Sequence, residues 1–312
     1  MKNKPYRYIL YLGLRLLQLA VWALPRRAGF FLAGGLAALA FQVLGRERQK
    51  TIRHLMIAWG GEKDPAELRR IARRVFIHFG ESAVDALRIP RMNREEADRL
   101  VEAGDGFERI DRVLAEGKGM ILLTAHFGNW ELMGAVIMLK GYKGTVVGRR
   151  IYYDKFNEAI LNLRGSMALR TIYQDASPRE FLRVLQDNQI LGILADQDLD
   201  WAEGIFVPFF GRPAHTLTAP VKLALASGAP IVPVFLPRQG ERYRLIVDDP
   251  IRVEMKGTRE ETIQEYTARW SRAVEKTIRA YPDQWAWMHR RWKTSPPEAE
   301  PARAPVSSGA KE

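Results

Sequence analysis

The chain has 312 residues, of which 47% are hydrophobic, so it can bury the core of one large α/β domain or of two smaller ones. It has no cysteine, which excludes thiolate catalysis, a cysteine-ligated zinc site and a disulfide framework, and which fits a reducing compartment. The net charge of +12 suits an anionic partner such as nucleic acid, a membrane surface or a phosphorylated substrate, although any one basic cluster could equally be a solvated surface.

Two apolar runs, residues 9–24 and 29–44, open the chain, and basic residues flank both runs on both sides. Each run is shorter than the roughly 20 residues that cross a bilayer straight. A cleaved signal is disfavoured, because Ala23-Leu24-Pro25 precedes paired arginines. We therefore expect an interfacial or re-entrant pair of helices at the cytoplasmic face of a membrane. A single membrane span and a buried helical hairpin of a soluble protein remain as alternatives.

The rest of the chain reads as helix first and then as alternating strands and helices. Asp64 as N-cap and Pro65 at the first helical position begin a helical pattern over residues 64–99. Strands are predicted at 119–124, 145–148, 190–194, 231–236 and 243–247, and helices near 129–140, 154–166, 177–188, 217–228 and 259–281. This alternation predicts an α/β fold in which helices flank a mainly parallel central sheet on both faces, preceded by the membrane-associated helical segment.

Three parts are expected along the chain. Residues 1–50 form the anchoring helices, residues 51–293 the main α/β domain, and residues 294–312 a disordered tail rich in proline, alanine and serine.

The most informative stretch, residues 124–131, reads Thr-Ala-His-Phe-Gly-Asn-Trp-Glu. It follows a predicted buried strand and opens a helix, which is where open α/β sheets place their active sites. We predict that His126 in the loop acts as a base and that Glu131 in the first helical turn orients it, as a carboxylate on one imidazole nitrogen fixes the tautomer. A buried histidine that caps backbone is the structural alternative. The five histidines are scattered, which argues against a zinc site.

This His-x4-Glu stretch resembles that of the lipid A biosynthesis (lauroyl/myristoyl) acyltransferases, a branch of the wider His-x4-Asp/Glu glycerolipid acyltransferases. The similarity covers roughly residues 10–293. Its further blocks are Val146-Val-Gly-Arg149, Asn162-Leu-Arg164-Gly, Ala195-Asp196-Gln197-Asp198, Phe206-Val-Pro-Phe-Phe-Gly211 and Pro282-Asp-Gln-Trp-Ala-Trp-Met-His289-Arg290-Arg291-Trp.

The resemblance implies direct attack of an acceptor hydroxyl on the thioester of acyl carrier protein or coenzyme A, without an acyl-enzyme and without a bound cofactor or metal. Arg149 and Arg164 are the candidates to bind the oxyanion or an acceptor phosphate, because guanidinium groups form paired hydrogen bonds to oxyanions. Asp196 and Asp198 could orient Arg164 or contact the acceptor sugar, and helix capping is the alternative for both. The aromatic run at 206–211 is expected to pack in the core or to line an acyl channel.

The acceptor implied by the resemblance is an anionic glycolipid, a lipid A precursor. The loop after Arg149 departs from the family, because Ile151-Tyr-Tyr-Asp-Lys155 stands where an Asn-Pro pair is usual. Another glycolipid, such as a phosphatidylinositol mannoside, therefore remains an alternative acceptor.

Two other classes of protein fit the sequence less well. A basic nucleic-acid-binding protein is suggested only by the charge, shows no recognisable motif and leaves the apolar N-terminal runs without a use. A serine hydrolase would need a Gly-x-Ser-x-Gly elbow, which the sequence lacks. We therefore expect a membrane-bound acyltransferase at the cytoplasmic face of the bacterial inner membrane, with no nucleic acid partner.

Overall fold

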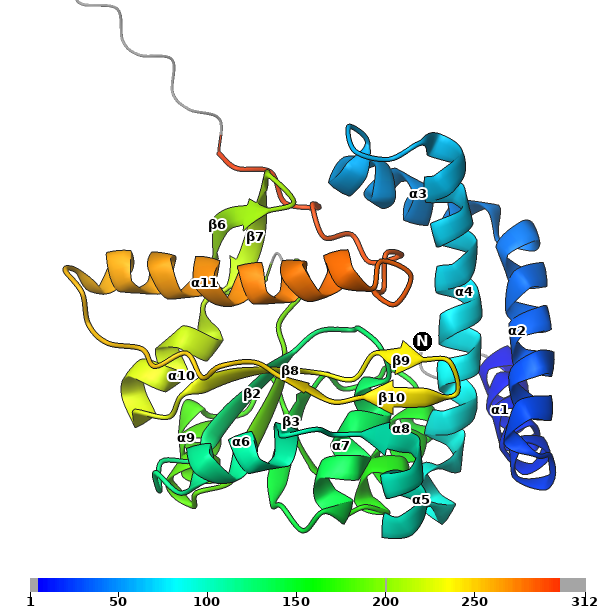
Figure 1. The fold of residues 1–312 in the computed structure, drawn as a ribbon, viewed down its shortest axis with the longest axis horizontal. Coiled ribbons are helices and arrows are strands. Elements are labelled where there is room, and N and C mark those ends of the chain that lie inside the picture. The colour runs from blue at the N-terminus through cyan, green and yellow to red at the C-terminus, as the bar shows by residue number, and fades with distance from the viewer. Residues whose placement is uncertain (1–4, 200, 298–312) are drawn as a thin grey trace, which may run out of the picture.

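The computed structural model of the protein describes residues 5–199 and 201–297 (Figure 1). Its helices are α1 (Pro5–Ala23), α2 (Arg26–Val43), α3 (Gly45–Trp59), α4 (Pro65–Arg88), the 3₁₀ turn η1 (Ile89–Arg91), α5 (Arg94–Leu100), α6 (Gly106–Leu114), α7 (Trp130–Leu139), α8 (Asp154–Gly165), α9 (Pro178–Gln186), α10 (Ala219–Ser227) and α11 (Arg259–Ala280). Its strands are β1 (Val101–Glu102), β2 (Met120–Thr124), β3 (Gly144–Gly148), β4 (Arg170–Tyr173), β5 (Ile190–Leu194), β6 (Gly204–Phe209), β7 (Arg212–Leu217), β8 (Ile231–Phe235), β9 (Arg238–Gln239), β10 (Arg242–Arg244) and β11 (Ile246–Val247).

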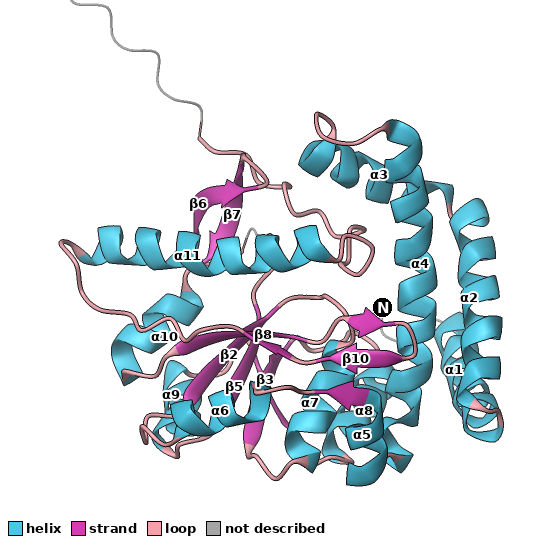
Figure 2. Cartoon of the chain, in the orientation of Figure 1, coloured by secondary structure: helices cyan, strands magenta, loops and turns pink. Residues whose placement is uncertain are grey.

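A six-stranded sheet in the order β11-β8-β2-β5-β3-β4 forms the centre of the molecule (Figure 2). Its neighbouring strands are parallel, except that β11 is antiparallel to β8. The predicted mainly parallel central sheet is therefore confirmed. The sheets are mixed overall, because β1, β10 and β9 form a smaller sheet and β6 and β7 form an antiparallel pair.

Strand β2 shows how helices cover both faces of this sheet. Ile121 and Leu123 pack on one face in a cluster that includes residues of α9, α10 and α11. Met120 and Leu122 pack on the other face with residues of α6 and α7. A strand buried on both faces reads as an unbroken apolar run, which explains why the sequence shows it as a short continuous run and not as alternating apolar and polar residues.

The N-terminal helices stand beside this α/β core, at the blue end of the chain in Figure 1, where α2 and α1 pack along α4. Their outer surfaces expose large apolar side chains, among them Phe31, which is 82% exposed, and Leu36 and Val43. Within the described ranges, no one helix is both long and apolar enough to cross a bilayer, and only α2 and α3 taken together, across a 90° bend, meet that test. The predicted boundary at residue 50 falls inside α3. The predicted tail lies outside the described residues from 298 onward.

Candidate active site

The loop between β2 and α7 carries the predicted histidine. Gly128 adopts φ +59°, and a Cβ there would collide with the carbonyl of Leu236, so only glycine fits this turn. Asn129 is the N-cap of α7: its side chain accepts a hydrogen bond from the backbone N–H of Leu132 (3.1 Å). These two residues turn the chain sharply at the carboxyl end of the sheet and expose His126 there.

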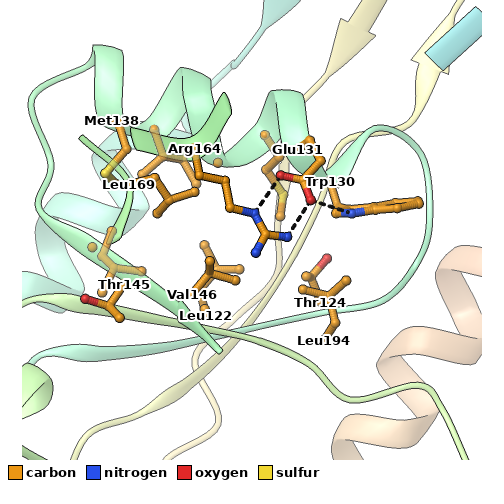
Figure 3. A pocket seen from close by; sticks show the side chains of 16 residues that line it. Leu122, Thr124, Trp130, Glu131, Met138, Thr145, Val146, Arg164, Leu169 and Leu194 are labelled. Atoms are coloured by element: carbon orange, nitrogen blue, oxygen red, sulfur yellow. Dashed lines mark hydrogen bonds and ion pairs between the residues drawn. The ribbon is translucent and has the colours of Figure 1, made fainter. Parts of the chain in front are cut away.

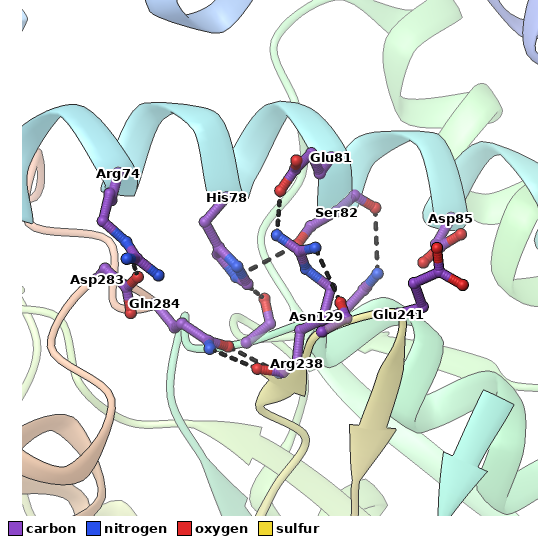
Figure 4. Close-up of polar contacts among 12 residues, drawn as sticks. Arg74, His78, Glu81, Ser82, Asp85, Asn129, Arg238, Glu241, Asp283 and Gln284 are labelled. Atoms are coloured by element: carbon purple, nitrogen blue, oxygen red, sulfur yellow. Dashed lines mark hydrogen bonds and ion pairs between the residues drawn. The ribbon is translucent and has the colours of Figure 1, made fainter. Parts of the chain in front are cut away.

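Helix α4 supports the back of this loop (Figure 4). His78 Nε2 donates a hydrogen bond to the carbonyl oxygen of Gly128 (3.2 Å), and the Asn129 amide donates to the carbonyl of Ser82 (3.1 Å). Burial lowers the pKa of His78 to about 4, so this ring is neutral at neutral pH and serves as a structural donor. Helix α4 thus fixes the main chain of the loop that carries His126.

The register of the sheet decides which carboxylate meets His126. Strands β2 and β5 pair Thr124 with Leu194, so the residues that follow them, His126 and Asp196, lie opposite each other. His126 Nδ1 donates to Asp196 Oδ1 (2.9 Å), while Asp196 Oδ2 accepts from the His126 backbone N–H (2.9 Å) and from Trp285 Nε1 (2.8 Å). The structure therefore forms a His126–Asp196 pair through Nδ1, and Nε2, which does not contact Asp196, is the ring nitrogen that can take a proton from a substrate.

The Asp196 carboxylate is ionised in this setting although its side chain is only 1% exposed. Burial alone would raise the pKa of Asp196, but the charge of His126 and the hydrogen bonds from His126 and Trp285 outweigh burial and hold the pKa well below its usual range. A buried anion beside Nδ1 favours the tautomer that keeps Nε2 as the acceptor, and it stabilises the imidazolium that forms when Nε2 takes a proton.

The prediction that Glu131 orients His126 is wrong in its geometry. The Glu131 carboxylate instead accepts two hydrogen bonds from Arg164, from Nε (3.0 Å) and from Nη2 (2.6 Å), and one from Trp130 Nε1 (3.2 Å) (Figure 3). Glu131 lies in the first turn of α7, whose direction carries the carboxylate toward α8 and away from the β5 edge. The prediction that Asp196 orients Arg164 is corrected by the same contacts, because Glu131 takes that place.

The two predicted arginines lie on the wall of one cavity of about 550 Å³, which His126 also lines. Arg164 is held by Glu131, and both side chains are 13% exposed. Arg149 follows β3 at the same carboxyl edge of the sheet, is exposed and has no acidic partner in the part of the chain that the structure describes. The cavity therefore contains a fixed guanidinium and a free one.

Apolar side chains make up much of the remaining wall. They come from α8, α9 and α10 and from the end of β5, and include Ile160, Phe181, Leu182, Leu194 and Leu223. A cavity lined in this way with a few polar groups at one end is the form that accepts an extended apolar ligand.

Gln197 and His289 lie next to His126; the sequence indicated no role for Gln197 and favoured a structural or phosphate-facing role for His289. The side-chain nitrogen of Gln197 lies 3.3 Å from Nε2 of both His126 and His289, whose ring centroids are 5.1 Å apart. Burial lowers the pKa of His289, and a charge on His126 lowers it further, so His289 stays neutral beside the base. Trp285 was also missed as a donor to Asp196; it lies in a matched block, but nothing in its spacing indicated a partner.

Asp198 does not face the cavity, which corrects the prediction of a substrate contact. Its carboxylate accepts hydrogen bonds from the backbone N–H groups of Lys293 and Thr294 and from the Thr294 hydroxyl (2.8 Å). It therefore anchors the C-terminal segment that carries His289. The aromatic residues Phe209 and Phe210 are buried in the core, which confirms the packing alternative for that run.

No group of three or more histidine or carboxylate side chains within the described residues could hold a metal ion. The acid–base pair, the guanidinium groups and the apolar cavity are thus the chemical features of the site: a base, positive charge for an oxyanion or phosphate, and a wall for a hydrocarbon chain.

Comparison with known proteins places these features in context. The sequence profile of the bacterial lipid A biosynthesis acyltransferases matches residues 2–294. The lipid A biosynthesis lauroyltransferase of Escherichia coli is 29% identical over 96% of this chain and 95% of its own, and the palmitoleoyltransferase of the same organism is 26% identical over 62% and 61%. A phosphatidylinositol mannoside acyltransferase of Mycobacterium tuberculosis is 28% identical over 50% of each chain, so the chain spans about half the length of that relative.

Proposed function

Because the chain belongs to the bacterial lipid A biosynthesis acyltransferase family, we propose that it transfers an acyl group from a thioester to a hydroxyl of a glycolipid. The observation that carries the proposal is the His126–Asp196 pair at one end of an apolar cavity, because Nε2 of His126 and the hydrocarbon wall share one space. The donor is acyl carrier protein or coenzyme A charged with an acyl chain, which the apolar wall accepts.

The reaction needs one base and one electrostatic stabiliser. Nε2 of His126 takes the proton of the acceptor hydroxyl, whose oxygen attacks the thioester carbon. The tetrahedral oxyanion lies near Arg149 and Gln197, which can donate hydrogen bonds to it. The C–S bond then breaks, the ester forms, and the proton held by His126 passes to the departing thiolate.

Glu131 supports this chemistry indirectly. By pairing with Arg164 in two hydrogen bonds it fixes a positive charge in the cavity wall, and the rigid guanidinium keeps that part of the wall in place. Glu131 is therefore proposed as a residue that positions Arg164, and Asp196 as the residue that orients His126.

The exposed apolar surfaces of α1 and α2 support attachment to a membrane, and we propose the cytoplasmic face of the inner membrane as its place. A monomeric soluble protein rarely leaves so many large apolar side chains in water on adjacent helices. A protein held there would meet an amphiphilic acceptor in the bilayer and a water-soluble donor in the cytoplasm.

A lipid A precursor is the proposed acceptor, and a phosphatidylinositol mannoside is the second candidate because of the similarity to the mycobacterial enzyme. The test supplies labelled acyl groups on acyl carrier protein or coenzyme A to each acceptor in detergent, with the wild type and His126→Ala. We expect transfer by the wild type and at least a hundredfold slower transfer by the variant. Equal rates for the two proteins would remove His126 as the base, and no transfer to either acceptor from either donor would refute the proposed reaction.

A further inference from the structure

A second hollow adjoins the active-site cavity, and it lies against the N-terminal helix. This groove, here called the α1 groove, has a volume of about 430 Å³ and lies between α1 and the segment that joins β3 to α8. The residues that matter for its chemistry are Tyr6, Arg7, Arg149, Arg150, Tyr152 and Tyr153. Arg149 and Ile151 line both the groove and the cavity that contains His126, so the two spaces meet at these residues.

Helix α1 is fixed to the opposite wall by aromatic contacts. The ring of Tyr11 lies edge-on to that of Phe156 (6.3 Å), and the Lys155 ammonium lies over the rings of Tyr8 (5.5 Å) and Tyr11 (5.4 Å). Phe156 in turn packs against Tyr153 at the start of α8 (5.3 Å). The groove is therefore bounded by ordered walls, one of which belongs to the helix that exposes apolar side chains to the surroundings.

The charged side chains that line the groove are all positive. Three arginines line it and no aspartate or glutamate does. Arg7 and Arg149 have no acidic partner in the described ranges, whereas Arg150 stacks over the Tyr173 ring at 4.2 Å. Guanidinium groups without a carboxylate partner are suited to bind phosphate through paired hydrogen bonds.

The aromatic residues suit a sugar beside that phosphate. Tyr152 is 79% exposed, so its ring and hydroxyl are both open to a ligand. An exposed tyrosine presents an apolar face against which a sugar ring can pack and a hydroxyl that can bind its polar groups. On the far side, Leu10 of α1 continues into the exposed apolar face of that helix.

From this arrangement we infer that the α1 groove binds the phosphate-bearing sugar headgroup of the acceptor glycolipid and thereby selects the acceptor. The inference rests on the acyl transfer proposed above and adds where the headgroup lies. Apolar chains of the acceptor stay with the exposed face of α1, the phosphate lies between Arg7 and Arg150, and the hydroxyl reaches His126 past Arg149. The divergent sequence Ile151-Tyr-Tyr-Asp-Lys155 forms one wall, so this part of the chain sets which headgroup fits.

The test uses Arg7→Ala and Tyr152→Ala, because neither side chain makes a hydrogen bond, ion pair or ring contact within the described residues. Arg272→Ala, an exposed arginine on α11, is the matched control for loss of charge. The probes are a phosphorylated lipid A precursor and the same compound after phosphatase treatment, each in mixed micelles. We expect each groove variant to raise the KM for the phosphorylated acceptor about tenfold, which corresponds to about 1.4 kcal/mol, and to leave kcat and the donor KM within about twofold.

Removal of the phosphates from the acceptor distinguishes phosphate binding in the α1 groove from other causes of a raised KM. The wild type should lose affinity on phosphatase treatment, and Arg7→Ala should add no further loss with the treated acceptor, because the partner of the arginine is gone. An unchanged acceptor KM in both variants would overturn the inference. The inference would also be overturned if the variants changed only the KM of a coenzyme A donor. It would be overturned as well if the variants lost as much binding to micelles of phosphatidylglycerol alone as to micelles that contain the acceptor.

A direct binding measurement keeps this test independent of catalysis. Calorimetric titration of the full chain with the phosphorylated precursor should give weaker binding for Arg7→Ala than for the wild type and for Arg272→Ala. If the wild type binds the precursor in this way but transfers no acyl group, the proposed function fails and the groove stands. If transfer occurs and the variants bind the precursor as the wild type does, the inferred headgroup site is wrong and the proposed acyl transfer stands.

Discussion

The Asp196 carboxylate is held by three N–H groups, which come from two points of one histidine and from a tryptophan. This arrangement fixes both the ring and the main chain of His126, so the carboxylate sets the position of the imidazole as well as its tautomer. The negative charge of Asp196 is as important as its shape. An asparagine amide of the same size could direct its N–H group toward Nδ1 of His126 and reverse the tautomer of the ring.

We therefore expect Asp196→Asn to lower kcat by about 10²–10⁴-fold, the range for loss of positioned acid–base assistance. The measurement is the steady-state rate of acyl transfer, with the folded state monitored by circular dichroism. Asp198→Asn is the matched control, since Asp198 is buried in the same segment but binds Lys293 and Thr294, and its effect should fall on stability. An Asp196→Asn enzyme with more than a tenth of the wild-type kcat would contradict the assignment.

At the residue scale the sequence singled out His126 and two arginines, which the structure places around one cavity, but it assigned the wrong carboxylate to the histidine. Glu131 is close to His126 along the chain, and sequence spacing can be judged only for such neighbours. Asp196 is seventy residues away, and it reaches His126 because β5 pairs with β2 in a particular register. Strand order in a parallel sheet depends on the crossover helices and their packing, which no local pattern encodes.

At the scale of elements, the packing of α2 on α4 depends on a glycine. A Cβ at Gly80 would lie 2.9 Å from the carbonyl oxygen of Ala33 and 2.9 Å from Cβ of Ala37, closer than side-chain carbons normally come. The two helices can therefore approach only while this position has no side chain. The same helix α4 supports the loop between β2 and α7 through His78, so its placement links the N-terminal helices to the candidate active site.

We expect Gly80→Leu to destabilise the protein by about 1–3 kcal/mol through overpacking at this helix contact, and to make the turn between α1 and α2 more sensitive to protease. The measurement is denaturant unfolding combined with limited proteolysis. Gly35→Ala on α2 is the control, because a Cβ there meets nothing within 4 Å and alanine favours the helix. A Gly80→Leu protein as stable as the wild type would show that α2 is only loosely attached.

Elements with a strong pattern were predicted and those without one were missed. The strands β2, β5 and β8 are buried apolar runs and appear where expected. The β6–β7 pair was not predicted, because Pro208 and Pro213 face each other within it and proline is depleted in strands. Strand β4 lies at the edge of the sheet, where only Ile172 among its residues is buried. It was missed because its sequence therefore shows little apolar pattern.

At the scale of the whole molecule, charge and apolar surface act together. The chain carries a net charge of +12, and its N-terminal helices expose apolar side chains on their outer surfaces. A protein of this kind combines attraction to anionic lipids with burial of apolar area at the headgroup boundary. The active-site cavity and the α1 groove would then open close to the plane in which glycolipids diffuse.

We expect the triple variant Phe31→Ser, Leu36→Ser, Val43→Ser to bind phosphatidylglycerol vesicles about 100-fold more weakly than the wild type, since each side chain contributes on the order of 1 kcal/mol when buried at the interface. Sedimentation of vesicles with bound protein measures the partition. Met255→Ser is the control, because Met255 is 57% exposed but lies far along the chain from α2. High salt should weaken the binding of both proteins by the same factor, as it screens only the electrostatic part. Unchanged partition of the triple variant would show that α2 does not enter the membrane surface and that charge alone holds the protein there.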